Sequence, residues 1–235
     1  MKWKKYRHIL LFTYCLLILW FIFPSGFSLE ETGEDDETVE SVNSDQIQEK
    51  PKIALTFDDG PNTKYTPVLL EGLKERNVKA TFFLIGENAE KPENREIIER
   101  MYQEGHLIGN HTYSHVEIAK VDNDTAIEEL KKTNQIIREI TGEEVLFMRP
   151  PFGEWQKELE KEIDLIPVMW SVDPLDWTTA NVDEVVNKVI AEVEEDDIIL
   201  LHDCYESSVQ AALRIVDLLL AEGYEFVTVD ELLLQ

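Results

Sequence analysis

From about residue 51 onward, short apolar runs alternate with amphipathic segments along the chain. This alternation is typical of β/α architectures, in which helices connect parallel strands. The runs that we expect to form strands are 53–57, 81–85, 107–109, 145–148, 166–172, 198–201 and 226–229. Seven candidate strands favour a distorted or incomplete (β/α) barrel over a doubly wound sheet, although periodicity alone does not separate the two.

Three of the segments between these runs have apolar residues at helical spacing. The pair Thr66-Pro67 is typical of a helix start, with the threonine as N-cap and the proline in the first turn. Apolar positions over 127–140 predict a second helix that stops at Gly142, and those over 212–220 predict a third before Gly223. These apolar stripes are expected to face the core.

The N-terminal segment has a different pattern. A basic stretch over residues 2–7 precedes an apolar run, and no charged residue occurs from 9 to 29. This is the pattern of an export signal, and it is about as long as a membrane-spanning helix. We expect residues 1–29 to be a signal-anchor, with a signal peptide cleaved near Gly26 and Ser28 as the alternative. Either way, the basic N-terminal side places the rest of the chain outside the cytoplasm, membrane-anchored or secreted.

Residues 30–50 are predicted to form a disordered acidic stalk. Residues 30–49 contain nine Asp or Glu, no Lys or Arg and no aromatic residue, a composition that buries too little apolar surface to fold. The remaining residues, 51–235, are long enough for one catalytic domain.

Charge and cysteine content narrow the choice of partners. The net charge of −26 repels nucleic-acid phosphates, so we expect no nucleic-acid partner. The two cysteines, Cys15 and Cys204, provide neither a disulfide framework nor a CxxC metal site. We also expect no obligate protein partner.

Ionisable side chains follow five of the expected strands. They are Asp58 and Asp59, His111 and His115, Arg149, Asp173 and Asp176, and His202 and Asp203. Catalytic groups of β/α barrels gather at the carboxyl ends of the strands. We therefore expect these side chains to converge on one site.

The spacing of His111 and His115 indicates a metal site. On a helical turn, residues four apart lie on one face, so both imidazoles can reach one cation. Two histidines and a carboxylate are a common catalytic zinc set that leaves a position open for water. Taken alone, the pair is equally consistent with a surface or core role. Thr112 replaces the glutamate of an HExxH helix, which excludes a zinc protease of that kind.

Two further strings carry candidate chemistry. Asp58 and Asp59 are adjacent, so on an extended segment they point in opposite directions and would have different roles, one binding metal and the other accepting a proton. Pro150 and Pro151 lack a backbone N–H, which makes Phe152 the first main-chain donor after the expected strand. A rigid turn there could direct this N–H at an oxyanion, although the string is also explained as a stiff loop.

Five strings, in order, resemble the motifs of NodB-type polysaccharide deacetylases, carbohydrate esterase family 4. They are TFDDG at 56–60, HTYSH at 111–115, RPPFG at 149–153, DPLDW at 173–177 and LLHD at 200–203. The resemblance extends from about residue 52 to the C-terminus. It implies the NodB homology fold and metal-dependent hydrolysis of N-acetyl groups from a polysaccharide, with release of acetate.

The resemblance also implies roles for the polar motif residues. Asp59, His111 and His115 would bind one divalent metal ion, usually Zn²⁺, with Co²⁺, Ni²⁺ and Mn²⁺ as alternatives. Asp58 would be the general base that deprotonates the attacking water. His202 would protonate the departing sugar amine.

Five more residues would support this reaction. Arg149 would hold the base ionised, and Asp176 would pair with the acid and keep it protonated. The N–H of Phe152 would stabilise the oxyanion, and Trp177 and Leu200 would wall the pocket for the acetate methyl group. The family often has tyrosine where this chain has Phe152, but the proposed donor is the backbone.

The expected substrate is peptidoglycan N-acetylglucosamine, because an exported enzyme on a short stalk would face a cell wall. Chitooligosaccharides, exopolysaccharides and xylan esters are alternatives. Relatives of this fold also hydrolyse non-sugar amides, although an extracellular location disfavours that reaction. An inactive carbohydrate-binding protein is the alternative from another class, but it would need neither a base nor an acid.

Overall fold

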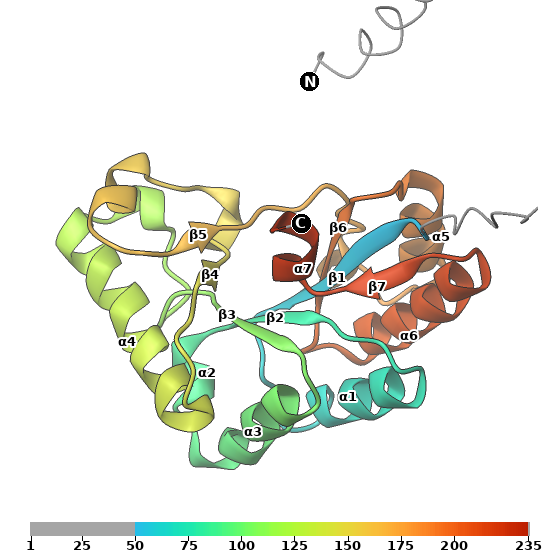
Figure 1. Cartoon of the computed structure of the whole chain (residues 1–235), viewed down its shortest axis with the longest axis horizontal. Helices are drawn as coiled ribbons and strands as arrows, with labels where there is room; N and C mark the ends of the chain where they lie inside the picture. The colour runs from blue at the N-terminus through green and yellow to red at the C-terminus, as the bar shows by residue number, and fades with distance from the viewer. Residues whose placement is uncertain (1–49, 235) are drawn as a thin grey trace, which may run out of the picture. The chain divides into compact units, whose positions relative to one another are not determined.

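The computed structural model describes residues 50–234, so the expectations for residues 1–29 and for nearly all of the acidic stalk lie outside it. Seven strands in this range pair in parallel in one curled sheet, in the order β5-β4-β3-β2-β1-β6, with β7 also paired to β1 (Figure 1). Their bounds are β1 Lys52–Asp58, β2 Thr81–Leu84, β3 Leu107–Asn110, β4 Phe147–Met148, β5 Ile166–Pro167, β6 Ile198–His202 and β7 Glu225–Val227. The predicted incomplete (β/α) barrel is confirmed.

Helices connect the strands and surround the sheet (Figure 1). The α-helices are α1 Thr66–Glu75, α2 Gly86–Ala89, α3 Arg95–Gln103, α4 Asn123–Thr141, α5 Val182–Glu192, α6 Glu206–Ala221 and α7 Val229–Leu233. Short 3₁₀ turns occupy Pro92–Asn94, Ile118–Lys120, Pro151–Gly153, Lys157–Lys161 and Asp176–Thr178. Within residues 50–234, no helix has the length and apolar character that a membrane span requires.

Strand β1 is buried on both faces and pairs with three other strands, β2, β6 and β7. Ile53, Leu55 and Phe57 belong to the large core cluster that the helices cover. Ala54 belongs to a smaller cluster on the opposite face, together with Phe83, Phe147, Val168 and Val229. Successive side chains of a strand alternate between faces, so Thr56 and Asp58 follow Ala54 on the inner face. The interior of the barrel therefore changes from apolar to polar towards the carboxyl end of β1.

The predicted strand 166–172 is divided in two. Its first residues form β5 against β4, whereas the N–H groups of Ser171 and Val172 donate to the carbonyl of Ile198 in β6, at 3.0 and 3.2 Å. Between the halves, the carbonyls of Val168 and Met169 accept hydrogen bonds from the Arg149 side chain, at 3.2 and 3.3 Å. The prediction of one continuous strand was wrong because a side chain from the neighbouring segment takes the ladder acceptors.

Three other predicted strands are shorter in the structure, among them the one expected at 81–85, which ends at Leu84. The strand expected at 145–148 comprises only Phe147–Met148, and the one expected at 226–229 is Glu225–Val227. The latter ends because Thr228 begins α7 with a capping box, in which its side chain and that of Glu231 satisfy backbone N–H groups.

The helix predictions hold except for one cap. Gly142, with φ 82°, ends α4 in the left-handed conformation, as expected. Thr66 is the first residue of α1 and not its N-cap, which is Tyr65. The Thr66 hydroxyl instead donates to the buried carboxylate of Asp203 at 2.5 Å. This bond ties the start of α1 to the end of β6.

Arg149, which follows β4, is completely buried inside the barrel. Its Nη1 donates to the Thr56 hydroxyl at 2.7 Å and to Asp58 Oδ1 at 2.9 Å. The guanidinium lies over the ring of Phe83, 4.4 Å from the centroid, and near that of Trp170, at 5.6 Å. These contacts come from β1, from β2 and from the interrupted strand, so this one side chain joins three segments.

We expect Arg149→Met to destabilise the protein by about 3–5 kcal/mol, because it leaves the Asp58 carboxylate buried without its cation. The measurement is the free energy of unfolding from urea titration of the purified protein. Arg76→Met is the matched control: Arg76 pairs with Asp217 at the surface, at 2.7 Å, and its loss should cost about 0–1 kcal/mol. Equal losses for the two variants would contradict this account of the core.

Candidate active site

A cleft of about 330 Å³ lies at the carboxyl ends of the strands. Its lining residues are Asp58, Asp59, His111, His115, Pro150, Phe152, Trp170, Asp173, Trp177, Leu200, His202 and Tyr205. Eight of the ten side chains predicted for the site are among them. The other two, Arg149 and Asp176, are buried directly behind the lining. The sequence therefore predicted which distant segments meet here.

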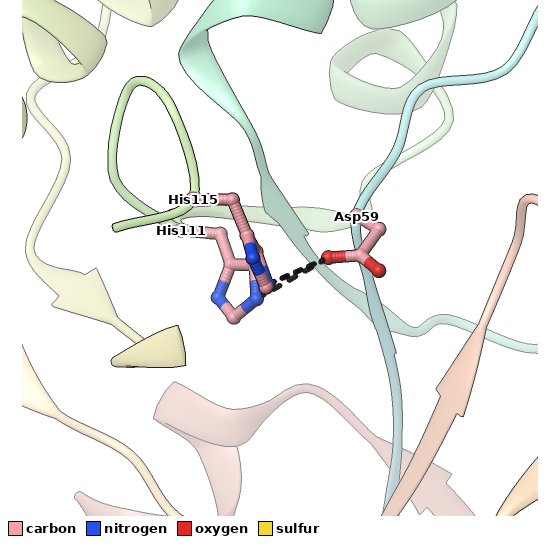
Figure 2. Close-up of side chains that lie close together, drawn as sticks. All are labelled: Asp59, His111 and His115. Carbon is pink, nitrogen blue, oxygen red and sulfur yellow. Dashed lines mark ion pairs between the residues drawn. The ribbon is translucent and has the colours of Figure 1, made fainter. Parts of the chain in front are cut away.

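Three of these side chains form a group with the spacing of a metal site. One oxygen of Asp59 and one nitrogen each of His111 and His115 lie within 4.8 Å of one another. The Nε2 atoms of His111 and His115 are 3.4 and 3.3 Å from Asp59 Oδ1, and Figure 2 shows the three side chains pointing toward one another. Asp59 Oδ1 is buried and has no hydrogen-bond partner. Converging ligand atoms around an unsatisfied buried carboxylate oxygen fit a divalent cation.

The two histidines converge through a loop and not through a helical turn, so that part of the prediction was wrong. Residues 111–115 form no helix, and both Thr112 and His115 have positive φ, at 62° and 60°. His111 Nδ1 lies 2.7 Å from the backbone carbonyl of Arg149. A carbonyl only accepts, so Nδ1 carries the proton and the Nε2 lone pair faces Asp59.

The adjacent aspartates both reach the cleft because the chain turns between them. Asp58 ends β1 with its Oδ1 on Arg149, whereas Asp59 has φ 72°. Asp58 Oδ2 lies 3.8 Å from His111 Nε2. The two carboxylates thus have different partners, as expected for different roles, but the extended geometry assumed for them ends at Asp58.

Local electrostatics favour the protonation states that a metal site needs. Burial raises the pKa of Asp59, but the imidazoles of His111, His202 and His115 outweigh it, and the net shift is downward. Burial, and then the neighbouring His111, lower the pKa of His115. An ionised carboxylate and a neutral imidazole are the forms that bind cations.

The pKa of His202 is shifted upward, in contrast to those of Asp59 and His115. Its Nδ1 lies 2.8 Å from Asp176 Oδ1, and its backbone N–H donates to Asp176 Oδ2 at 2.9 Å. Burial alone would lower the pKa of His202, but the bond to Asp176 and the charges of Asp58 and Asp59 raise it to about 9. The imidazole is therefore protonated at neutral pH. Its Nε2 lies 3.9 Å from Asp59 Oδ2, at the metal group.

Backbone strain is concentrated around this cleft. In the described part of the chain, seven residues other than glycine have positive φ, and five belong to the motif segments: Asp59, Thr112, His115, Phe152 and Leu175. Such conformations cost about 1–3 kcal/mol each and cluster at functional sites. For Thr112, Phe152 and Leu175 the sequence contains no signal, because residues of these types rarely adopt a positive φ.

The cleft wall is largely aromatic. Trp177 is 56% exposed and Phe152 is 65% exposed, whereas Leu200 is buried. The rings of Phe152 and His115 meet edge to face, with their centroids 5.0 Å apart. Trp170 and Tyr205 also line the cleft and were not predicted as site residues. In the sequence, Trp170 is distinguished only by lying three residues before Asp173, and Tyr205 only by lying three residues after His202. Many aromatic residues without a function lie equally close to a motif.

Together, the curled parallel barrel, the paired carboxylates, the two-histidine group and the protonated His202 define a (β/α)-barrel hydrolase. The chain belongs to the polysaccharide deacetylase family: the sequence model of that family, "Polysaccharide deacetylase", matches residues 45–168. Members of this family are metal-dependent deacetylases, which agrees with the group formed by Asp59, His111 and His115.

Relatives and solved structures agree with this membership. The chain is 43% identical to a peptidoglycan-N-acetylglucosamine deacetylase of Bacillus cereus over 76% of this chain and 67% of that protein. It is 37% identical to the peptidoglycan-N-acetylglucosamine deacetylase PgdA of Listeria monocytogenes. That match covers 81% of this chain but only 42% of the longer Listeria protein. The structure of peptidoglycan deacetylase PdaC from Bacillus subtilis matches 78% of this chain and 90% of that one, with a TM-score of 0.75 and 36% identity.

We expect the purified protein to bind one divalent cation per chain. Asp59→Asn or His111→Ala should weaken binding by more than the roughly 10–100-fold that loss of an outer-shell partner costs. Isothermal titration of the metal-stripped protein with Zn²⁺ measures this affinity. Asp173→Asn is the control, because it neutralises another carboxylate of the same cleft outside the group. Equal weakening by Asp173→Asn would place the metal elsewhere.

Proposed function

We propose that this protein removes N-acetyl groups from peptidoglycan N-acetylglucosamine outside the cytoplasm and releases acetate. The observation that carries the proposal is the convergence, in one cleft, of a paired aspartate, a metal-binding group and a protonated histidine. Similar proteins bear the names of peptidoglycan deacetylases, which supports the choice of polymer. The basic and apolar N-terminal residues support export, with residues 1–29 as signal-anchor or signal peptide and residues 30–50 as a stalk.

The cation would be held by Asp59, His111 and His115, and we propose Zn²⁺ because two imidazoles and one carboxylate suit that ion. Bound there, it would supply Lewis-acid activation of a water molecule and of the acetyl carbonyl. The Arg149 carbonyl keeps His111 in the tautomer that presents Nε2. The cleft leaves space beside this group for a substrate, since its volume is about 330 Å³.

Asp58 is the proposed general base. Its Oδ1 is engaged by Arg149, whereas its Oδ2 faces His111 Nε2 at 3.8 Å and so lies beside the metal group. The hydrogen bond from the guanidinium fixes the orientation of this carboxylate. Asp58 accordingly accepts the proton that water loses as it attacks the N-acetyl carbonyl.

His202 is the proposed general acid. Asp176 holds the imidazole by Nδ1 and leaves Nε2 directed toward the cleft. Because its pKa is raised to about 9, His202 enters the reaction as imidazolium. It donates the Nε2 proton to the sugar amine as the carbon–nitrogen bond breaks, and acetate and a free amine are the products.

The cleft walls position the acetyl group. Phe152 has a φ of 62° and lies in a turn that follows two prolines. Its backbone N–H is the proposed hydrogen-bond donor to the oxyanion. Trp177 and Leu200 supply apolar surface for the acetyl methyl group. Because the proposed donor is the backbone, the phenylalanine in place of the family's frequent tyrosine should leave this step intact.

The reaction is tested by acetate release from purified peptidoglycan and from chitooligosaccharides. We expect release from peptidoglycan that a chelator abolishes and Zn²⁺ restores, and that Asp58→Asn lowers by about 100-fold or more, as expected for loss of a general base. Asp173→Asn, in the same cleft, controls for altered charge. Release from chitooligosaccharides alone would make these oligosaccharides, and not peptidoglycan, the substrate. No release from either glycan by the metal-loaded protein would refute the proposal.

The pH dependence of kcat tests the acid. His202 must be protonated to act, so activity should fall as pH rises through about 9. Asp176→Asn removes the main interaction that raises this pKa, so the alkaline limb should move to lower pH. Asp183→Asn neutralises an exposed carboxylate paired with Arg214 and should leave the limb in place. An unmoved limb in Asp176→Asn would rule out His202 as the titrating acid.

A further inference from the structure

The loop 111–115, which joins the two histidines of the metal group, is held almost entirely by other elements. The first N–H groups of α2 donate to its carbonyls, Gly86 to Thr112 at 2.9 Å and Glu87 to Tyr113 at 2.8 Å. The N–H of His111 donates to the carbonyl of Leu84 at 2.9 Å, and the next three N–H groups of the loop donate to side chains outside it. Buried backbone groups need partners, so the conformation of this loop is set by its surroundings.

One side chain of α4, that of Glu129, accepts three hydrogen bonds from the loop. Glu129 Oε2 accepts the successive N–H groups of Tyr113 at 2.9 Å and Ser114 at 2.7 Å, and its Oε1 accepts the Ser114 hydroxyl at 2.9 Å. Hydrogen bonds to an ionised acceptor are about twice as strong as neutral ones. No other carboxylate in residues 50–234 accepts two hydrogen bonds from this loop's backbone. Glu129 thus holds the apex of the loop halfway between the two histidines.

The loop also needs this support because it is strained and closely packed. Thr112 and His115, on either side of the held residues, both have positive φ, a conformation that persists only where the surroundings over-determine it. On the α2 side, a Cβ at Gly86 would lie 2.6 Å from the Tyr113 ring and 2.9 Å from its Cα. The loop is therefore clamped between α2 and the Glu129 carboxylate.

We propose that Glu129 is a positioning residue of the metal centre: its carboxylate fixes the 111–115 loop so that both imidazoles face Asp59. This inference rests on the proposed function, because it takes the group of Asp59, His111 and His115 as the metal site. Glu129 itself neither lines the cleft nor belongs to the metal group. It acts from the outer side of the loop, through Tyr113 and Ser114.

The test compares Glu129→Ala with Glu128→Ala. Glu128 is the preceding residue of α4, and its exposed side chain makes no hydrogen bond or ion pair with the described residues. The control therefore removes the same kind of side chain without touching the loop. We expect Glu129→Ala to weaken Zn²⁺ binding by about 10–100-fold in isothermal titration, as outer-shell losses do. It should also change the visible absorption spectrum of the Co²⁺-loaded protein, which reports ligand geometry. Glu129→Gln keeps an acceptor oxygen and should lie between Glu129→Ala and wild type.

Thermal unfolding of the metal-free proteins separates positioning from stability. A purely structural role would lower the melting temperature of Glu129→Ala but leave its Co²⁺ spectrum and Zn²⁺ affinity equal to those of Glu128→Ala, and that result would overturn the proposal. If Glu129→Ala fails to fold, Glu129→Asp is the deciding variant, because its shorter side chain keeps the charge but withdraws from the loop. An unchanged Zn²⁺ affinity of Glu129→Asp would also overturn the proposal. Wild-type protein that binds no metal would instead refute the proposed function.

Discussion

The buried ion pair between Arg149 and Asp58 is the interaction on which both the barrel and the site depend. A fully buried guanidinium is tolerated only when its charge is paired and its donors are satisfied, and here the partners come from β1 and from the interrupted strand. Its bonds to the carbonyls of Val168 and Met169 lie where the strand expected at 166–172 is divided. The Arg149 backbone carbonyl also accepts from His111, so one residue orients both the proposed base and a proposed metal ligand.

The cleft holds groups whose environments move their protonation equilibria in opposite directions. The pKa of Asp59 is lowered by its imidazole neighbours and that of His115 by burial, whereas Asp176 and the cleft aspartates raise that of His202 to about 9. Titratable groups whose environments shift their pKa values apart are the basis for assigning the acid and the base in an enzyme. The same cleft can therefore contain ionised carboxylates, a neutral imidazole and an imidazolium near neutral pH.

The site is built on loops, but rigid elements hold each loop. The 111–115 loop is fixed by α2 and α4, and the segment around Asp176 is fixed by β6 through His202. This arrangement explains why five residues with positive φ persist around one cleft. Membership of the polysaccharide deacetylase family is consistent with such a preorganised centre, while the polymer, the metal and the cellular location stay proposals.

By itself, the sequence determined the parallel β/α fold and the approximate strands, and it predicted most of the side chains that meet in the cleft, because apolar periodicity and residues placed after strands are local signals. Only the tertiary structure decided how these parts deviate from regular geometry. The strand at 166–172 is divided because Arg149, distant in sequence, takes its carbonyls. His111 and His115 meet through a strained loop and not a helix, because Glu129 and α2 satisfy its backbone. Trp170 and Tyr205 join the cleft through long-range packing, which no local pattern encodes.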